Sequence, residues 1–179
     1  MDMAMLKKSL CTVVLCTSDT YTLEETDKNA TLKNVYMCDI PNGSLIVKMD
    51  KIRFNNFLKD QKVWGFNKHS DFLIITDDKL VFIELKSRTE VGKELRNECV
   101  QKFASDKCTV NYADNIFKEI LAKNPFFASR EPHFVLLYQA PSILKHPTTL
   151  GAEFPNLTPD TFRQIPVQNN GTISFNKTI

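Results

Sequence analysis

Two carboxylates and one lysine stand at a spacing that can bring them together at one end of a β-hairpin. Asp71 begins one apolar segment, Glu84 and Lys86 end the next, and the dipeptide Asp77-Asp78 separates the two segments. A two-residue turn there places Asp71 opposite Glu84, with Cβ atoms about 4.5–5.5 Å apart. Lys86 shares their face because side chains alternate along a strand. Charges in such a place must be paired or must bind a cation, since burying them alone is costly.

The turn length decides whether the two carboxylates meet. A four-residue turn keeps the same pairing, whereas a three-residue turn would place Asp71 and Glu84 on opposite faces. With an even turn, both faces of the hairpin are apolar beyond the charged end. The site face carries Leu73, Ile75, Leu80 and Phe82, and the other face carries Phe72, Ile74, Val81, Ile83 and Leu85. A hairpin that is apolar on both faces requires cover on both, which predicts a sheet between two layers of helices.

The first third of the chain reads as strands with one short helix. The segment 9–16 predicts a buried strand, and the segments 36–40 and 45–49 predict a hairpin around Asn42-Gly43, a dipeptide suited to positive φ. Asp50 can cap a short helix whose apolar residues are Phe54, Phe57 and Leu58.

After Lys86 the apolar spacing becomes helical. One run contains Leu95, Cys99 and Phe103, and a second contains Ala113, Ile116, Phe117, Ile120 and Leu121, which predicts two amphipathic helices. The apolar run 133–138, placed between two prolines, then predicts a buried strand. This order of elements is typical of an α/β domain.

Composition limits the class of protein. The 179 residues are 42% hydrophobic and 25% charged, which predicts a single domain over 1–179. Its N-terminal part is expected to form a strand and a hairpin, and its C-terminal part is rich in proline. No apolar run approaches the roughly 20 residues of a membrane-spanning helix, so we expect no membrane partner. Five cysteines without a CxxC pair argue against a disulfide framework and a zinc site, and favour a cytoplasmic protein. A net charge of +2 predicts no whole-protein attraction to nucleic acid.

The motif resembles that of the PD-(D/E)xK nuclease superfamily, which has the restriction-endonuclease-like fold. The matching residues are Ser70-Asp71, twelve intervening residues, and Glu84-Leu85-Lys86. The resemblance implies a mixed α/β sheet flanked by helices on both faces. It also implies that Asp71, Glu84 and the carbonyl of Leu85 bind Mg²⁺, with Mn²⁺ as a substitute, and that Lys86 orients or activates the attacking water. Mg²⁺ suits this role because it prefers oxygen ligands and stabilises charge on phosphate.

The resemblance covers about residues 50–138, which it implies are the core of a nuclease-like domain, with the N-terminal strand and hairpin and the Pro-rich C-terminal segment as extensions. It includes the helix that follows Lys86. Gln101 stands where many members carry a glutamine that supports the active site. Two departures are visible: Ser70 replaces the proline, and the segment 50–60 offers no glutamate as an extra ligand. Candidates for that ligand elsewhere are Glu24, Glu25 and Asp39.

We therefore expect a Mg²⁺-dependent nuclease that hydrolyses phosphodiester bonds of DNA, although no residue separates DNA from RNA. An alternative is a noncatalytic nuclease-fold module that binds nucleic acid or a partner protein, because a fold does not imply its function. A third, by analogy, is a restriction-like or antiviral defence effector. A homodimer or a larger partner subunit would then supply specificity.

Several nearby residues have simpler interpretations. His69 is expected at the surface, and Asp77-Asp78 are expected to serve the turn. Lys93, Arg96 and Lys102 alternate with glutamates, which favours a solvated helix face over a phosphate-binding one.

Overall fold

The computed structural model describes residues 13–52, 68–141 and 155–179. The predicted helix around Phe54, Phe57 and Leu58 lies outside these residues. The described elements, in chain order, are β1 (Val13–Leu15), β2 (Tyr21–Glu24), β3 (Asn34–Cys38), β4 (Leu45–Lys48), the 3-10 turn η1 (Met49–Lys51), β5 (Phe72–Ile75), β6 (Lys79–Lys86), α2 (Lys93–Glu119), β7 (Glu131–Gln139), β8 (Arg163–Val167), β9 (Gly171–Ser174) and the 3-10 turn η2 (Phe175–Lys177).

Six strands form a mixed sheet in the order β1-β4-β5-β6-β7-β8, and β2-β3-β9 form a second, smaller sheet. The pairs from β1 to β6 are antiparallel, whereas β6-β7 and β7-β8 are parallel. Parallel pairing needs a crossover, and α2 provides it between β6 and β7. Strands β1, β4 and β8 lie outside the expected core range of about 50–138, yet they belong to the large sheet.

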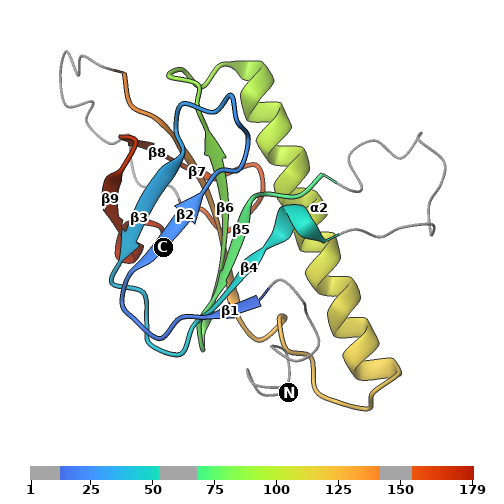
Figure 1. Ribbon diagram of the computed structural model, residues 1–179. Helices are drawn as coiled ribbons and strands as arrows, with labels where there is room; N and C mark the ends of the chain where they lie inside the picture. Colours follow the sequence, from blue (N-terminus) through green and yellow to red (C-terminus); the bar gives the residue numbers. More distant parts are fainter. Residues whose placement is uncertain (1–12, 53–67, 142–154) are drawn as a thin grey trace.

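The α/β class and the mixed sheet agree with the sequence prediction, and the described residues show a different cover on each face of the large sheet. Helix α2 lies on one face of the large sheet, and the small sheet lies on the other (Figure 1). Residues of β2, β3 and β9 pack with Ile74, Val81 and Ile83 in one buried cluster. Residues of α2 pack with Leu73, Phe82 and Phe134 in the other. Within the described residues one α-helix covers one face, so helices on both faces remain an expectation.

The predicted hairpin of 36–40 with 45–49 is wrong. β3 pairs with β2 and β9 in the small sheet, whereas β4 pairs with β1 and β5 in the large sheet. The turn predicted at Asn42-Gly43 is present, and Gly43 has the expected positive φ, +85°. The chain uses the turn to pass from one sheet to the other.

The two helices expected after Lys86 are one continuous helix, α2, of 27 residues. No glycine or proline interrupts the sequence between Lys93 and Glu119, so nothing ends the helix midway. The buried residues Leu95, Cys99 and Phe103 lie on the face toward the sheet. None of the helices in the described residues is long and apolar enough to cross a membrane.

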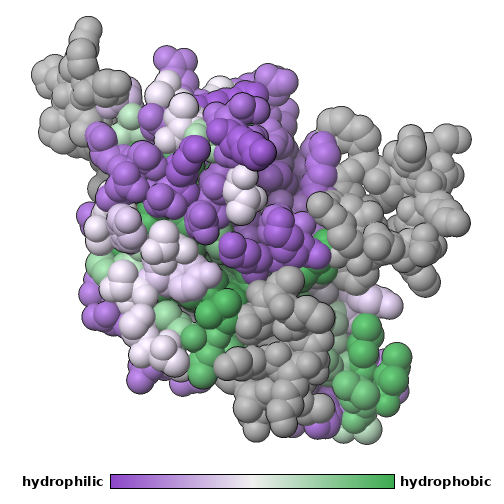
Figure 2. Space-filling view, viewed as in Figure 1, coloured by the Kyte–Doolittle hydropathy of each residue, from purple (hydrophilic) through white to green (hydrophobic). Residues whose placement is uncertain are grey.

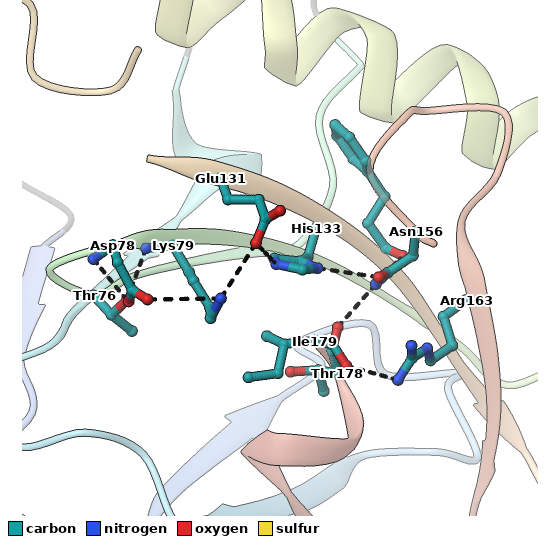
Figure 3. A network of polar contacts seen from close by, with 10 residues as sticks. Thr76, Asp78, Lys79, Glu131, His133, Asn156, Arg163, Thr178 and Ile179 are labelled. Atoms are coloured by element: carbon teal, nitrogen blue, oxygen red, sulfur yellow. Dashed lines mark hydrogen bonds and ion pairs between the residues drawn. The ribbon is translucent and has the colours of Figure 1, made fainter. Parts of the chain in front are cut away.

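A polar network fixes the C-terminal segment against the sheet (Figure 3). Lys79 lies 3.3 Å from Glu131, whose carboxylate lies 3.2 Å from Nε2 of His133. Nδ1 of His133 lies 3.0 Å from the Asn156 side-chain oxygen, and the Asn156 amide donates to the Thr178 carbonyl at 2.9 Å. This network lies at the start of β6, whereas Glu84 and Lys86 lie near its end.

Candidate functional site

The register predicted for the central hairpin is confirmed. Phe72 pairs with Ile83 and Ile75 pairs with Leu80, so opposite residue numbers sum to 155 along the whole ladder. The Thr76 N–H donates to the Lys79 carbonyl at 3.0 Å, which closes a two-residue turn. Asp77 and Asp78 occupy that turn, and Asp78 accepts a hydrogen bond from the Thr76 hydroxyl at 2.9 Å. The alternation of the strands therefore places Glu84 and Lys86 on the face of the sheet that α2 covers.

Asp71 lies one residue before β5 and faces the end of β6. Its N–H donates to the Ile83 carbonyl at 3.1 Å, and its Oδ2 accepts the Leu85 N–H at 2.7 Å. Burial, and then the charge of Glu84, raises the pKa of Asp71 well above its usual value. The carboxylates of Asp71 and Glu84 thus interact electrostatically, and the Leu85 backbone lies against Asp71.

Glu84 is a fully buried carboxylate with two lysines on one of its oxygens. Its Oε1 lies 2.9 Å from Nζ of Lys86 and 2.5 Å from Nζ of Lys102. Its Oε2 is buried and has no hydrogen-bond partner within 13–52, 68–141 and 155–179. Burial raises the pKa of Glu84, and the positive charges of Lys102 and Lys86 oppose that rise. The unpartnered oxygen is the one unsatisfied acceptor of this cluster among the described residues.

Lys86 bridges β6 and α2. Its ammonium lies 2.8 Å from Oε1 of Glu98 in addition to the contact with Glu84. Burial alone would lower the pKa of Lys86, but the two carboxylates outweigh burial and raise it. Lys86 is therefore protonated at neutral pH and cannot serve as a free base.

Helix α2 contributes Glu98 and Lys102 to this cluster, and the role predicted for Gln101 stays a prediction. Gln101 is half-buried on α2, and no hydrogen bond or ion pair found among the described residues joins it to the cluster. Lys102 and Glu98, interpreted as part of a solvated face, contact Glu84 and Lys86 instead. Helical spacing could have indicated that Glu98 and Lys102 face the sheet, because positions 98 and 102 lie beside the buried positions 95, 99 and 103 on one stripe of the helix.

The candidates for a third acidic ligand can now be ranked by position. Glu24 and Glu25 line a small recess with Asp71, together with Thr26, Lys48, Asp50, Lys51 and Phe72. The charge of Glu25 also contributes to the raised pKa of Asp71. Asp39 instead accepts a hydrogen bond from the Cys38 thiol. Among the described residues, no group of three His, Cys, Asp or Glu side chains is arranged to hold a metal ion.

His69 is not the surface residue that the sequence suggested. Its side chain is fully buried, and Nδ1 lies 2.9 Å from Oδ1 of Asp106 on α2. The same Asp106 carboxylate accepts the Ser70 N–H at 3.1 Å. This contact holds the backbone immediately before Asp71 against the helix, and so it helps to position the carboxylate of Asp71.

The site end of the sheet is polar at the surface. The region where β6 ends and α2 begins is covered by hydrophilic residues in the view of Figure 2. Comparisons with protein-family models, with curated proteins and with solved structures gave no match. The cluster of Asp71, Glu84, Lys86, Glu98 and Lys102 is therefore the feature of the molecule that bears on function.

Proposed function

We propose that this protein is a divalent-metal-dependent nuclease that hydrolyses phosphodiester bonds of DNA. Asp71, Glu84 and the carbonyl of Leu85 would hold Mg²⁺ or Mn²⁺, and Lys86 would contact the reacting groups. The observation that carries the proposal is the unpartnered Oε2 of Glu84, a buried anionic oxygen beside a second carboxylate.

The donor set fits a hard divalent cation. Carboxylate and carbonyl oxygens are the ligands that Mg²⁺ prefers, and it keeps several waters rather than demanding a full protein cage. Two acidic side chains are therefore enough, in agreement with the lack of a group of three in the described residues. A cation at Oε2 would satisfy the acceptor of Glu84 and relieve its repulsion with Asp71.

Lys86 supports phosphoryl chemistry through its charge. When bound, the metal would neutralise charge on the phosphate and activate water. The ammonium of Lys86, held between Glu84 and Glu98, donates hydrogen bonds toward a water or a phosphate oxygen. It acts as a donor in this proposal, because its two carboxylate neighbours keep it protonated.

One observation favours the alternative of a noncatalytic module. Lys86 and Lys102 both contact Oε1 of Glu84, so the cluster can also be read as a buried ion-pair network that only fixes α2 to the sheet. In that case the protein would bind nucleic acid or a partner protein without cleaving it. The catalytic alternative includes defence or restriction-like activity. It also includes a homodimer or a larger subunit that supplies specificity.

The test is cleavage by the purified protein of linear DNA, circular DNA and RNA, each with Mg²⁺, Mn²⁺ or EDTA. We expect cleavage of DNA with a divalent ion and none with EDTA. Glu84→Gln should abolish it, whereas the matched control Glu119→Gln, at the exposed far end of α2, should retain it. Nucleic-acid binding without cleavage under every condition would establish the noncatalytic module instead.

A further inference from the structure

We infer that Lys102 is a displaceable counter-ion that occupies the carboxylate pair until a divalent cation replaces it. This inference rests on the proposed function, because it concerns how the same site takes up its metal. It assigns Lys102 a role in controlling metal affinity rather than in contacting the substrate.

The ammonium of Lys102 serves both acids of the pair. Its Nζ lies 2.5 Å from Oε1 of Glu84, the shortest ion-pair distance among the described residues. Asp71 and Glu84 both act to raise the pKa of Lys102, and Lys102 in turn acts to lower theirs. One positive charge therefore moderates the repulsion between the two carboxylates, which is the electrostatic effect that a bound metal ion would also have.

Lys102 is easier to displace than Lys86. Lys86 has two carboxylate partners, Glu84 and Glu98, and so remains held if Glu84 turns to another cation. Among the described residues, Glu84 is the one carboxylate within ion-pair distance of Lys102. The side chains of Lys102 and Lys86 keep 16% and 22% of their surfaces exposed, so both heads can reach solvent, and the second carboxylate of Lys86 is what distinguishes the two lysines.

A second acceptor is available to the displaced ammonium. Glu98 lies four residues before Lys102 on α2, and this order, with glutamate N-terminal to lysine, is the favourable one for an ion pair along a helix. The charge of Lys102 already contributes to lowering the pKa of Glu98, whose side chain is 34% exposed. Movement of one ammonium by one helical turn would thus exchange Glu84 for Glu98.

The consequence is competition between one internal charge and one external cation. The attraction between two charges in contact is much stronger in a partly buried site than in water. Metal binding must release this contact, so Lys102 weakens metal affinity. Without metal, the same contact limits the repulsion that the carboxylate pair would otherwise suffer.

The first experiment measures Mn²⁺ binding by calorimetry for the wild type, Lys102→Gln, Lys102→Arg and the control Lys107→Gln, an exposed residue of the same helix. We expect Lys102→Gln to bind Mn²⁺ at least about tenfold more tightly, since it removes the competing charge. Lys102→Arg and Lys107→Gln should stay within about threefold of the wild type because the local charge is kept. Equal or weaker binding by Lys102→Gln would overturn the inference.

A second experiment uses the wild type alone, so it holds even if Lys102→Gln fails to fold. The ¹⁵N signals of the lysine ammonium groups are recorded as Mg²⁺ is added. The Lys102 signal should move away from its position in the Glu84 ion pair, and the Lys86 signal should keep its ion-paired character. A Lys102 signal unchanged by saturating Mg²⁺ would also overturn the inference.

The outcomes separate this inference from the proposed function. Tighter Mn²⁺ binding by Lys102→Gln without any cleavage would support the counter-ion and refute the nuclease. Cleavage by a wild type that binds Mn²⁺ as tightly as Lys102→Gln would refute the counter-ion and keep the nuclease. Failure of both proteins to bind a divalent ion would refute both.

Discussion

Replacing Glu84 with glutamine tests the charge cluster through stability as well as activity. The change keeps the shape of the side chain and removes the anion that Lys86 and Lys102 share. From the carboxylate pair alone, one would expect relief of repulsion with Asp71 and a more stable protein. The two ammonium contacts reverse that expectation, because the variant leaves two neighbouring positive charges with less compensation.

The size of the loss follows from opposing contributions. At an effective dielectric constant of 20, each ion pair at 2.5–2.9 Å contributes about 6 kcal/mol, and desolvation of a buried carboxylate costs several kcal/mol. Breaking a buried pair by removing one partner costs about 3–5 kcal/mol when the other charge stays buried. Both lysines are partly exposed and can turn toward water, so we expect about 2–3 kcal/mol for Glu84→Gln.

Urea unfolding in EDTA, followed by circular dichroism, measures this loss. With a slope of about 2 kcal/mol per molar urea, the midpoint should fall by about 1–1.5 M. Glu119→Gln should leave it unchanged, because Glu119 is exposed and pairs with its sequence neighbour. A midpoint equal to or above that of the wild type would refute the assigned role of Glu84 as the anion that holds two lysines.

Three further predictions address the site and its surroundings. Lys86→Ala should lower single-turnover cleavage by about 10²–10³-fold while Mn²⁺ affinity changes little. Lys86→Arg should also cleave more slowly, since a planar guanidinium cannot replace a compact ammonium. Near-normal cleavage by Lys86→Ala would return the residue to a structural role. Burial raises the pKa of Asp71 in the folded protein. Between the ordinary value of 3.8 and that raised pKa, the folded state holds a proton that the unfolded state has lost, so the stability of the metal-free wild type should fall as pH rises through this interval. Asp71→Asn should lose less over this interval in urea titrations at successive pH values, and identical slopes would contradict the burial of the carboxylate. Cys108 is exposed, whereas burial raises the pKa of Cys99 to about 12. A thiol reagent should therefore label Cys108 at least about tenfold faster than Cys99, as measured by peptide mass spectrometry. Equal labelling of the two would contradict the packing of α2.

The central hairpin could be predicted because all its determinants are local. A two-residue turn fixes the register, and the alternation of side chains along each strand then decides which residues of 71–76 and 79–86 share a face. The strand 133–138 was equally readable, because β7 contains the whole run. These elements carry Asp71, Glu84 and Lys86, so the motif and its register were accessible from sequence.

The errors concern choices that depend on distant partners. Asn42-Gly43 marks a turn in either arrangement, but only tertiary packing decides that β4 pairs with β5 rather than with β3. Lys102 looks like a solvated lysine because its partner Glu84 lies 18 residues away on a strand. His69 looks exposed for the same reason, since its partner Asp106 comes from the helix.

The parallel pairing of β3 with β9 has a consequence for how the chain is made. These strands lie more than a hundred residues apart, and β9 completes the sheet that covers one apolar face of the central hairpin. While the chain emerges from the ribosome, the cover that β2 and β3 give to that face stays incomplete until residue 174 is available. Native pairing of such distant segments is slow, and exposed apolar strands favour association between chains in the meantime. Yield during expression should therefore depend on chaperone supply, and removal of residues 171–179 should produce aggregates rather than a smaller folded domain.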